Sequence, residues 1–123
     1  MELYNSPDEY LFNLETSSSA EAKRLWRKSI REKWNYKCAY CESERDLTID
    51  HIIPQVKGGS DFTRNVVCCC KSCNHSKGHN SWEEWYKNQE FFTEDRFNSI
   101  LEWMIIKNDQ KLYLYKPRRN DAS

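Results

Sequence analysis

A carboxylate, an imidazole and an amide occur near one another in the middle of this sequence, and a lysine follows them. Asp50 and His51 are neighbours, and Asn74 and Lys77 come after a short intervening segment. Histidine can act as a base near neutral pH. Carboxylate and amide oxygens bind hard cations, so Asp50 and Asn74 favour Mg²⁺ or Mn²⁺. With Lys77 near the phosphate, the set suits metal-assisted hydrolysis of a phosphodiester bond.

Each of these side chains also has an ordinary structural explanation. A histidine beside an aspartate is commonly a hydrogen-bonded structural pair, and Asn74 could cap a helix that follows it. Taken singly, Asp50, His51 and Asn74 favour those explanations. Their joint occurrence in this order and spacing favours catalysis.

Four of the six cysteines form two Cys-x-x-Cys pairs on either side of Asp50 and His51, namely Cys38/Cys41 and Cys70/Cys73. Two such pairs suit a tetrahedral site in which four thiolates bind one structural zinc at about 2.3 Å. Disulfides are the alternative. Cys69 could replace Cys70, but the two-residue spacing to Cys73 favours Cys70. We interpret Cys68 and Cys69 as small apolar residues of a strand.

A helix over about residues 19–35 should precede the first cysteine pair. Ser18 and Glu21 form a capping box. Apolar residues recur at helical spacing on one side: Ala22, Leu25, Trp26, Ile30 and Trp34. The other side carries a stripe of positive charge: Lys23, Arg24, Arg27, Lys28 and Arg31. Such a stripe is either a solvated helix face or a surface that binds the DNA backbone.

The central segment reads as two short strands and a helix. Residues 47–53 are rich in β-branched side chains and predict a strand that Pro54 ends. A turn over 57–60 leads to a return strand over 66–69, and helical sequence resumes near Asn74.

The C-terminal part reads as two more helices within residues 81–107. Ser81 with Glu84 predicts a capping box, and Thr93 begins the next helix. One apolar stripe is expected to be core: Phe97, Ile100, Leu101, Met104 and Ile105. Residues 112–115 predict an edge strand, and a basic tail follows: Lys116, Arg118 and Arg119.

Length and composition indicate one globular domain. The chain has 123 residues, of which 38% are hydrophobic and 31% charged. No apolar run reaches the roughly 18 residues that span a bilayer, and the acidic start does not resemble a signal peptide. We therefore expect a reducing cytoplasm, of a bacterium or of a cell infected by a phage, where paired cysteines favour metal binding.

The net charge is zero, but the charges are unevenly distributed. Residues 1–20 carry four acids and no bases, whereas residues 21–45 carry eight bases and four acids. Such asymmetry is a better guide to a phosphate-binding face than the total charge.

The ordered combination of motifs over residues 38–78 resembles the HNH nucleases. The matching positions are Cys38-x-x-Cys41, Asp50-His51-Ile-Ile-Pro54, Gly58-Gly59, Asn65, Cys70-x-x-Cys73-Asn74 and Lys77-Gly78. The resemblance implies an α+β fold with a ββα-metal (His-Me finger) core, in which two strands and a helix surround one catalytic cation. A Cys₄ zinc knuckle and flanking helices would complete it.

The resemblance also implies roles for single residues. His51 matches the general base, and Asp50 and Asn74 match the protein ligands of the catalytic Mg²⁺ or Mn²⁺. Asn65 matches a residue that fastens the loop without touching the cation. Lys77 matches a basic position close to the active site.

The paired cysteines match the ligands of one structural zinc per chain. The motif gives no role to His75 or His79. Residues 81–107 loosely resemble the C-terminal part of small free-standing HNH proteins of bacteria and phages.

We therefore predict a single HNH domain over residues 1–123, with its motif core at 38–78. The expected activity is metal-dependent hydrolysis of DNA, one strand per active site, by a monomer or a homodimer. The alternative is a zinc-ribbon module that binds DNA or protein without cutting.

Overall fold

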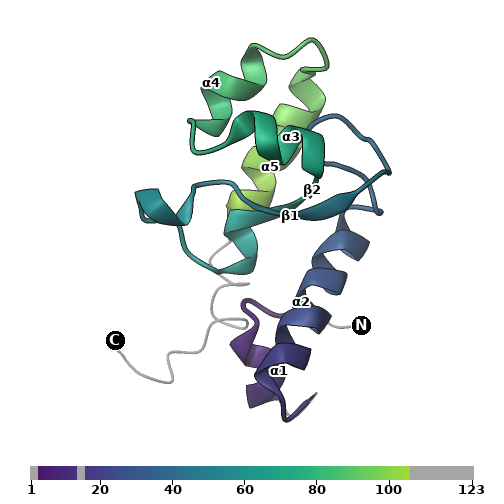
Figure 1. Cartoon of the computed structure of the whole chain (residues 1–123), viewed down its shortest axis with the longest axis vertical. Helices are drawn as coiled ribbons and strands as arrows, with labels where there is room; N and C mark the ends of the chain where they lie inside the picture. Colours follow the sequence, from purple (N-terminus) through teal and green to yellow (C-terminus); the bar gives the residue numbers. More distant parts are fainter. Residues whose placement is uncertain (1–2, 14–15, 106–123) are drawn as a thin grey trace.

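The computed structural model describes residues 3–13 and 16–105. Two antiparallel strands lie at the centre, β1 (Leu47–His51) and β2 (Val66–Cys70). The chain passes directly from β2 into α3 (Lys71–Lys77), which lies above the hairpin in Figure 1. The mixed α+β architecture expected from the sequence is confirmed.

The register of the hairpin decides which residues share a face. Asp50 is opposite Val67, and His51 is opposite Val66. Because successive side chains alternate between faces, Asp50 and His51 point to opposite sides of the sheet. All five residues of β2 are buried, and these include Cys68 and Cys69 as expected.

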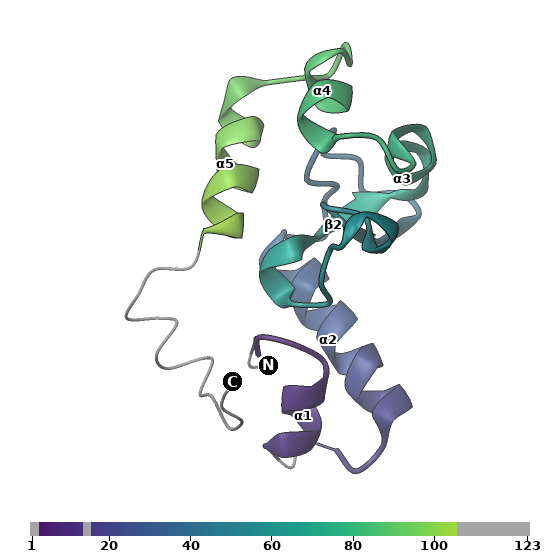
Figure 2. The ribbon, with the colours of Figure 1, turned by 90° about the vertical axis from the view of Figure 1, so that its left-hand side faces the viewer.

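The helix α2 (Ser19–Lys33) packs against the face of the sheet that carries His51. The Ser18 side chain accepts a hydrogen bond from the Glu21 backbone nitrogen, which confirms the N-cap. The reciprocal half of the expected capping box is not formed, because the Glu21 carboxylate binds Arg24 and the Ser18 nitrogen donates to Thr16 Oγ1. A buried cluster forms on this side: Tyr10, Ala22, Trp26, Ile30 and Val66. Tyr10 belongs to α1 (Asp8–Phe12), a short helix beside α2 that the sequence did not predict (Figure 2).

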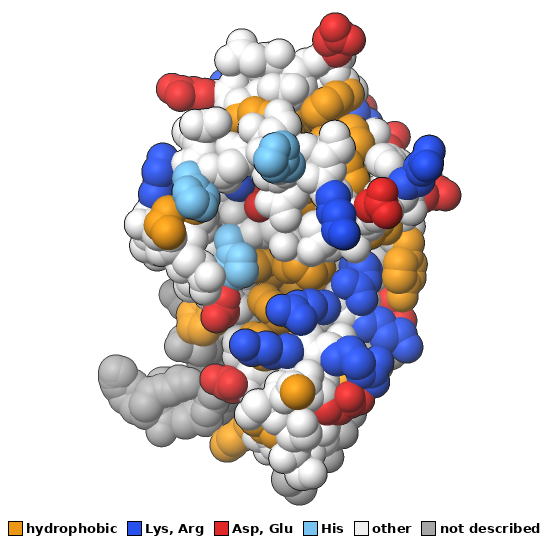
Figure 3. Space-filling model, in the orientation of Figure 1, with side chains coloured by type: hydrophobic (Ala, Val, Ile, Leu, Met, Phe, Trp, Pro, Cys, Tyr) orange, Lys and Arg blue, Asp and Glu red, His pale blue; other side chains and the backbone are white. Residues whose placement is uncertain are grey.

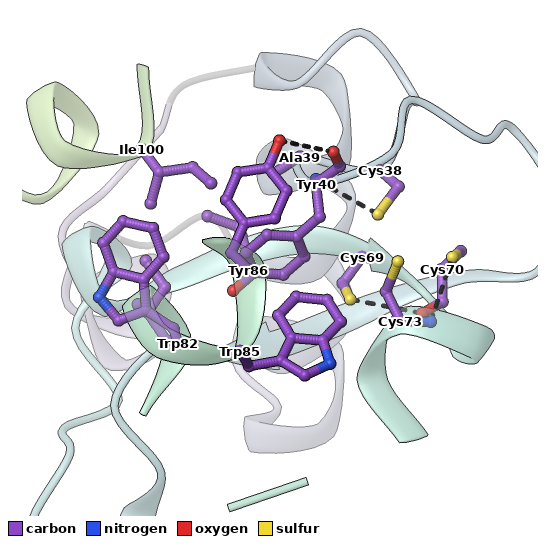
Figure 4. Packing of buried hydrophobic residues seen from close by; sticks show 12 residues of the cluster. Cys38, Ala39, Tyr40, Cys69, Cys70, Cys73, Trp82, Trp85, Tyr86 and Ile100 are labelled. Carbon is purple, nitrogen blue, oxygen red and sulfur yellow. Dashed lines mark hydrogen bonds between the residues drawn. The ribbon is translucent and has the colours of Figure 1, made fainter. Parts of the chain in front are cut away.

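The helices α4 (Trp82–Lys87) and α5 (Glu94–Met104) cover the other side of the molecule. The Thr93 side chain accepts from the Arg96 backbone nitrogen and caps α5 as predicted. Aromatic rings fill the second buried cluster (Figure 4). Tyr40 makes edge-to-face contacts with Trp85 and Tyr86, with ring centroids 5.0 and 5.3 Å apart.

Trp34 joins these two clusters. Its partly buried ring, one residue beyond the end of α2, packs against both of them. It also meets the Trp103 ring of α5 at a centroid distance of 5.4 Å. Trp34 thus connects the buried cluster beside α2 with the buried cluster beneath α4 and α5.

Three local expectations were wrong. The helix expected to resume near Asn74 begins earlier, at Lys71 with Cys70 as its N-cap, so the alternative role of Asn74 as a helix cap does not hold. Ser81 precedes α4 but makes no side-chain capping bond. Ile105 follows the end of α5 and is 63% exposed, because the core stripe ends with the helix.

The edge strand expected over 112–115 and the basic tail of Lys116, Arg118 and Arg119 lie outside the described residues. None of the helices in residues 3–13 and 16–105 is long and apolar enough to cross a membrane.

Hydrogen bonds join the N-terminal segment and α2 to the loop that follows β1, and we call this contact the clamp. Thr63, in the short 3₁₀ helix η2 (Thr63–Asn65), lies at the centre of this contact. Its hydroxyl donates to the Tyr4 carbonyl at 2.5 Å and accepts from the Trp26 indole nitrogen at 2.9 Å. The Thr63 backbone nitrogen donates to the Asn5 carbonyl at 2.7 Å.

Replacing Thr63 by valine should destabilise the fold by about 1–3 kcal/mol, because the buried Trp26 N–H loses its acceptor. Urea unfolding measures the change. Thr48→Val is the matched control, since the Thr48 side chain on β1 is only half-buried. It should stay within about 0.5 kcal/mol of the unchanged chain. Equal losses for the two variants would contradict the clamp.

Candidate active site

Three of the side chains singled out in the sequence line one hollow. Asp50 and His51 at the end of β1 and Asn74 on α3 surround a space of about 280 Å³. His79, just beyond α3, lines the same hollow, whereas His75 is exposed on α3 and is not among its lining residues. The strand and the helix that the sequence predicted therefore bring Asp50, His51 and Asn74 to one hollow.

Asp50 is buried and held by two donors. Its Oδ2 accepts a hydrogen bond from the Tyr40 hydroxyl at 3.2 Å and forms an ion pair with the Lys77 ammonium at 3.1 Å, while its Oδ1 accepts a long hydrogen bond from the same ammonium at 3.5 Å. Burial raises the pKa of Asp50, while Lys77 and then Tyr40 oppose that rise by stabilising the carboxylate. Burial and the nearby Asp50 charge raise the pKa of Tyr40 well above its usual value, so the phenol stays protonated and donates.

We expected Lys77 to supply positive charge near the phosphate, but the structure pairs that charge with Asp50. Its side chain is 0% exposed, and its ammonium also donates to the His51 carbonyl at 3.0 Å. A buried ammonium requires a partner, and Asp50 is that partner. Lys77 lies next to the site, as its place in the motif suggested, but its charge is directed at the carboxylate.

His51 has an acidic partner that sequence reasoning missed. The Nε2 atom of His51 lies 2.7 Å from Oδ1 of Asp61, and the Gln55 amide donates to the same oxygen at 2.9 Å. Asp61 lies in the loop between the two strands and has no motif spacing of its own. The only signal in the sequence was an acid in the loop that follows the histidine.

Asn65 fastens this loop to itself. Its Oδ1 accepts from the Ile53 nitrogen at 3.0 Å, and its Nδ2 donates to the carbonyls of Ile53 and Ser60 at 3.1 and 2.9 Å. The loop thereby brings Asp61 back to His51. These bonds correspond to the loop-fastening role that the resemblance implied.

The four paired cysteines converge at the other end of the hairpin. One sulfur atom from each lies within 4.8 Å of the others: Cys38, Cys41, Cys70 and Cys73. The sulfurs of Cys41 and Cys70 are 3.7 Å apart. The edge of a tetrahedron with metal–sulfur bonds of about 2.3 Å is about 3.8 Å, so the cluster has the dimensions of a zinc site.

The pKa values within the cluster diverge. Hydrogen bonds from the thiols of Cys69 and Cys73 lower the pKa of Cys38, whereas the Cys38 contact raises that of Cys73. Burial raises the pKa of Cys41 to about 11. Four thiolates this close together repel one another, so holding all four in the charged form requires a cation.

The model of the HNH endonuclease family matches residues 38–90. This segment includes both cysteine pairs, β1, β2 and α3. Residues 38–90 belong to the HNH endonuclease family. The β1–β2–α3 arrangement beside the cysteine cluster fits the ββα-metal fold of that family.

Two relatives support the assignment. One match is to a CRISPR-associated endonuclease Cas9 of Corynebacterium diphtheriae, 41% identical over 68 residues. A second match, 31% identical over 94 residues, is to YoqL, an SPbeta prophage-derived protein of Bacillus subtilis named as an HNH endonuclease. The matches take 52% and 64% of this chain but span only 6% and 39% of the two relatives.

The basic stripe of α2 lies beside the HNH segment and divides into two rows. Lys23 and Arg27 line a second hollow of about 330 Å³ together with His51, Gln55 and Asp61. The remaining row does not line that hollow: Arg24, Lys28 and Arg31. Arg24 is engaged in an ion pair with Glu21 on the same helix. Figure 3 shows these cations gathered over α2, on the face that also carries histidine side chains.

The loop of the HNH segment leaves no room for a side chain at Gly59. A Cβ atom there would lie 1.7 Å from the Ile53 carbonyl oxygen and 2.9 Å from Nδ2 of Asn65. We expect Gly59→Ala to detach the loop from Asn65 and to let trypsin cleave the backbone after Lys57 and Arg64. The measurement is the rate of cleavage in limited proteolysis.

Gly58→Asn is the matched control. Nothing lies within 4 Å of a Cβ at Gly58, and asparagine tolerates the left-handed conformation of that residue, φ +92°. Its proteolysis should resemble that of the unchanged chain. Equal resistance of both variants would show that the loop does not depend on the close approach at Gly59.

Proposed function

We propose that this chain is a metal-dependent endonuclease that hydrolyses phosphodiester bonds of DNA. The observation that carries the proposal is the meeting of Asp50, His51 and Asn74 in one hollow. Lys23 and Arg27 border the adjoining hollow, where they can attract the flanking phosphates. A zinc module that only binds would have no use for this set of side chains.

His51 is the proposed general base. A carboxylate only accepts hydrogen bonds, so the contact with Asp61 places the imidazole proton on Nε2. The lone pair of Nδ1 is then available to take a proton from water as that water attacks the phosphorus in line. Asp61 orients the ring and stabilises the imidazolium that results.

Asp50 and Asn74 are the proposed ligands of a catalytic Mg²⁺ or Mn²⁺. Both residues line the same hollow, and their oxygen donors suit a hard cation. Such a cation, when bound, stabilises the negative charge of the pentacovalent phosphate and of the departing 3′ oxygen. Asp50 is fixed for this role by Lys77 and Tyr40.

The cysteine cluster is proposed to hold one structural zinc. All six cysteines are free thiols, and four of them have the separation that a tetrahedral ion requires. A reducing cytoplasm, our proposed location, keeps such thiols available for metal. The ion would join the knuckle before β1 to the start of α3, which flank the catalytic residues.

One active site is expected to break one strand at a time. The described residues hold one set of Asp50, His51 and Asn74, and the two strands of a duplex run in opposite directions. A second cut therefore requires rebinding by a monomer or a second site of opposite polarity in a homodimer. Supercoiled plasmid should pass through a nicked form before linear DNA appears.

Replacing His51 by alanine should reduce cleavage of supercoiled plasmid about 10²–10⁴-fold with Mg²⁺ or Mn²⁺ present, because the base is lost. DNA binding should persist, because Lys23 and Arg27 remain. Gels measure the nicked product, and fluorescence anisotropy measures binding. Asp61→Ala should cause a smaller loss, since the ring remains but is no longer oriented.

His75→Ala is the matched control, because that histidine is exposed on α3 outside the hollow. It should cut at the normal rate, and EDTA should stop both proteins. Undiminished cutting by His51→Ala would refute the proposed base. An unchanged chain that binds DNA but never cuts it would favour the non-catalytic zinc-ribbon module.

Replacing both Lys23 and Arg27 by glutamine should weaken binding to every duplex sequence alike. Each lost phosphate contact flattens the plot of log binding constant against log salt concentration by about 0.9, so the expected change is about 1.8. Anisotropy titrations at several salt concentrations measure this slope.

Lys71→Gln combined with Lys87→Gln is the charge-matched control. Lys71 lies at the opposite end of the hairpin from His51, and the Lys87 ammonium lies 5.1 Å from the centre of the Phe97 ring. The control should keep the slope of the unchanged chain. Equal slopes for both double variants would show that the cations of α2 form a solvated helix face and do not contact DNA phosphates.

A further inference from the structure

The two parts of the molecule that the proposed function assigns to metals touch each other through one side chain. Tyr40 lies between Cys38 and Cys41 in the first cysteine pair. Its hydroxyl nevertheless reaches the other site, where it donates to Oδ2 of Asp50 at 3.2 Å. A knuckle residue thereby contacts the carboxylate of the catalytic set directly.

Tyr40 has no freedom to move independently of the knuckle. Its side chain is 0% exposed and packs edge-to-face against Trp85 and Tyr86 (Figure 4). Its backbone nitrogen donates to the Cys38 sulfur at 3.4 Å. Its carbonyl accepts from the Tyr86 hydroxyl and from Arg96 Nε, both at 2.8 Å.

The hydroxyl of Tyr40 also determines which oxygen of Asp50 is left for a ligand. Tyr40 and Lys77 both approach Oδ2, at 3.2 and 3.1 Å. The Lys77 ammonium also donates a hydrogen bond to Oδ1, which at 3.5 Å is long and therefore weak. The Tyr40 hydroxyl thus occupies Oδ2, whereas Oδ1 carries the long bond from Lys77 and retains more lone-pair capacity for a cation in the hollow.

We propose that Tyr40 is a positioning residue that couples the cysteine knuckle to the catalytic cation site by holding the Asp50 carboxylate. The inference rests on the proposed function. When the four converging thiolates order the knuckle, they also fix the position of the Tyr40 ring. The Tyr40 hydroxyl in turn fixes the Asp50 carboxylate. Partners of this kind typically change metal affinity 10–100-fold when they are removed.

The test is direct Mn²⁺ binding, measured by electron paramagnetic resonance of the free ion, on the zinc-loaded full chain without DNA. Tyr40→Phe removes only the hydroxyl and keeps the ring contacts. It should bind Mn²⁺ about tenfold more weakly while retaining one zinc per chain. Asp50→Ala should lose this binding altogether.

Tyr86→Phe is the matched control. It removes a buried hydroxyl that bonds to the Tyr40 carbonyl but does not contact Asp50, and Arg96 still satisfies that carbonyl. Its Mn²⁺ affinity should equal that of the unchanged chain. An equal loss in both variants would mean that the knuckle as a whole matters and would overturn the role of the Tyr40 hydroxyl.

A second measurement covers the case in which Tyr40→Phe is poorly folded. Thermal unfolding of Tyr40→Phe, Asp50→Asn and the double variant forms a cycle, and residues that act through one another give losses that do not add. Additive losses would overturn the proposal, as would unchanged Mn²⁺ affinity or loss of zinc in Tyr40→Phe. Mn²⁺ binding that survives Asp50→Ala would instead count against the proposed cation site itself.

Discussion

The antiparallel pairing of β1 with β2 is the constraint on which the other parts of this molecule depend. Its register sets Asp50 opposite Val67 and His51 opposite Val66. A slip of one residue would exchange the two faces, turning His51 inward and Asp50 toward α2. The same pairing sets Leu47 opposite Cys70, which anchors the start of α3 beside the cysteine cluster.

The buried ion pair of Lys77 and Asp50 beside this hairpin fixes the orientation of a side chain more than it stabilises the fold. Lys77 is fully enclosed and pairs with Asp50, which is itself 6% exposed. Burying two charges costs solvation energy that their attraction offsets only when the geometry is good. The Tyr40 hydroxyl and the His51 carbonyl supply the additional hydrogen bonds that such a pair needs. The gain is a carboxylate with one orientation.

What could be predicted from the sequence was what local spacing encodes. The spacing of the two cysteine pairs predicted the four-sulfur cluster, because a Cys-x-x-Cys turn brings its two sulfurs together wherever it occurs. The strands and the caps at Ser18 and Thr93 followed from residue types. Asp61 and Tyr40 could not be predicted, since both reach the site through the tertiary fold. Lys77 was misplaced because sequence gives charge but not burial.

Trp34 has a consequence for how the molecule meets its substrate. One ring packs into both hydrophobic clusters, so the cations of α2 and the imidazole of His51 share a continuous rigid support. Trp34 therefore leaves no hinge at the end of α2 about which the helix could rotate relative to the sheet. Under the proposed function, the distance between the α2 cations and the His51 imidazole is therefore fixed by the fold, and a bound substrate must fit that distance.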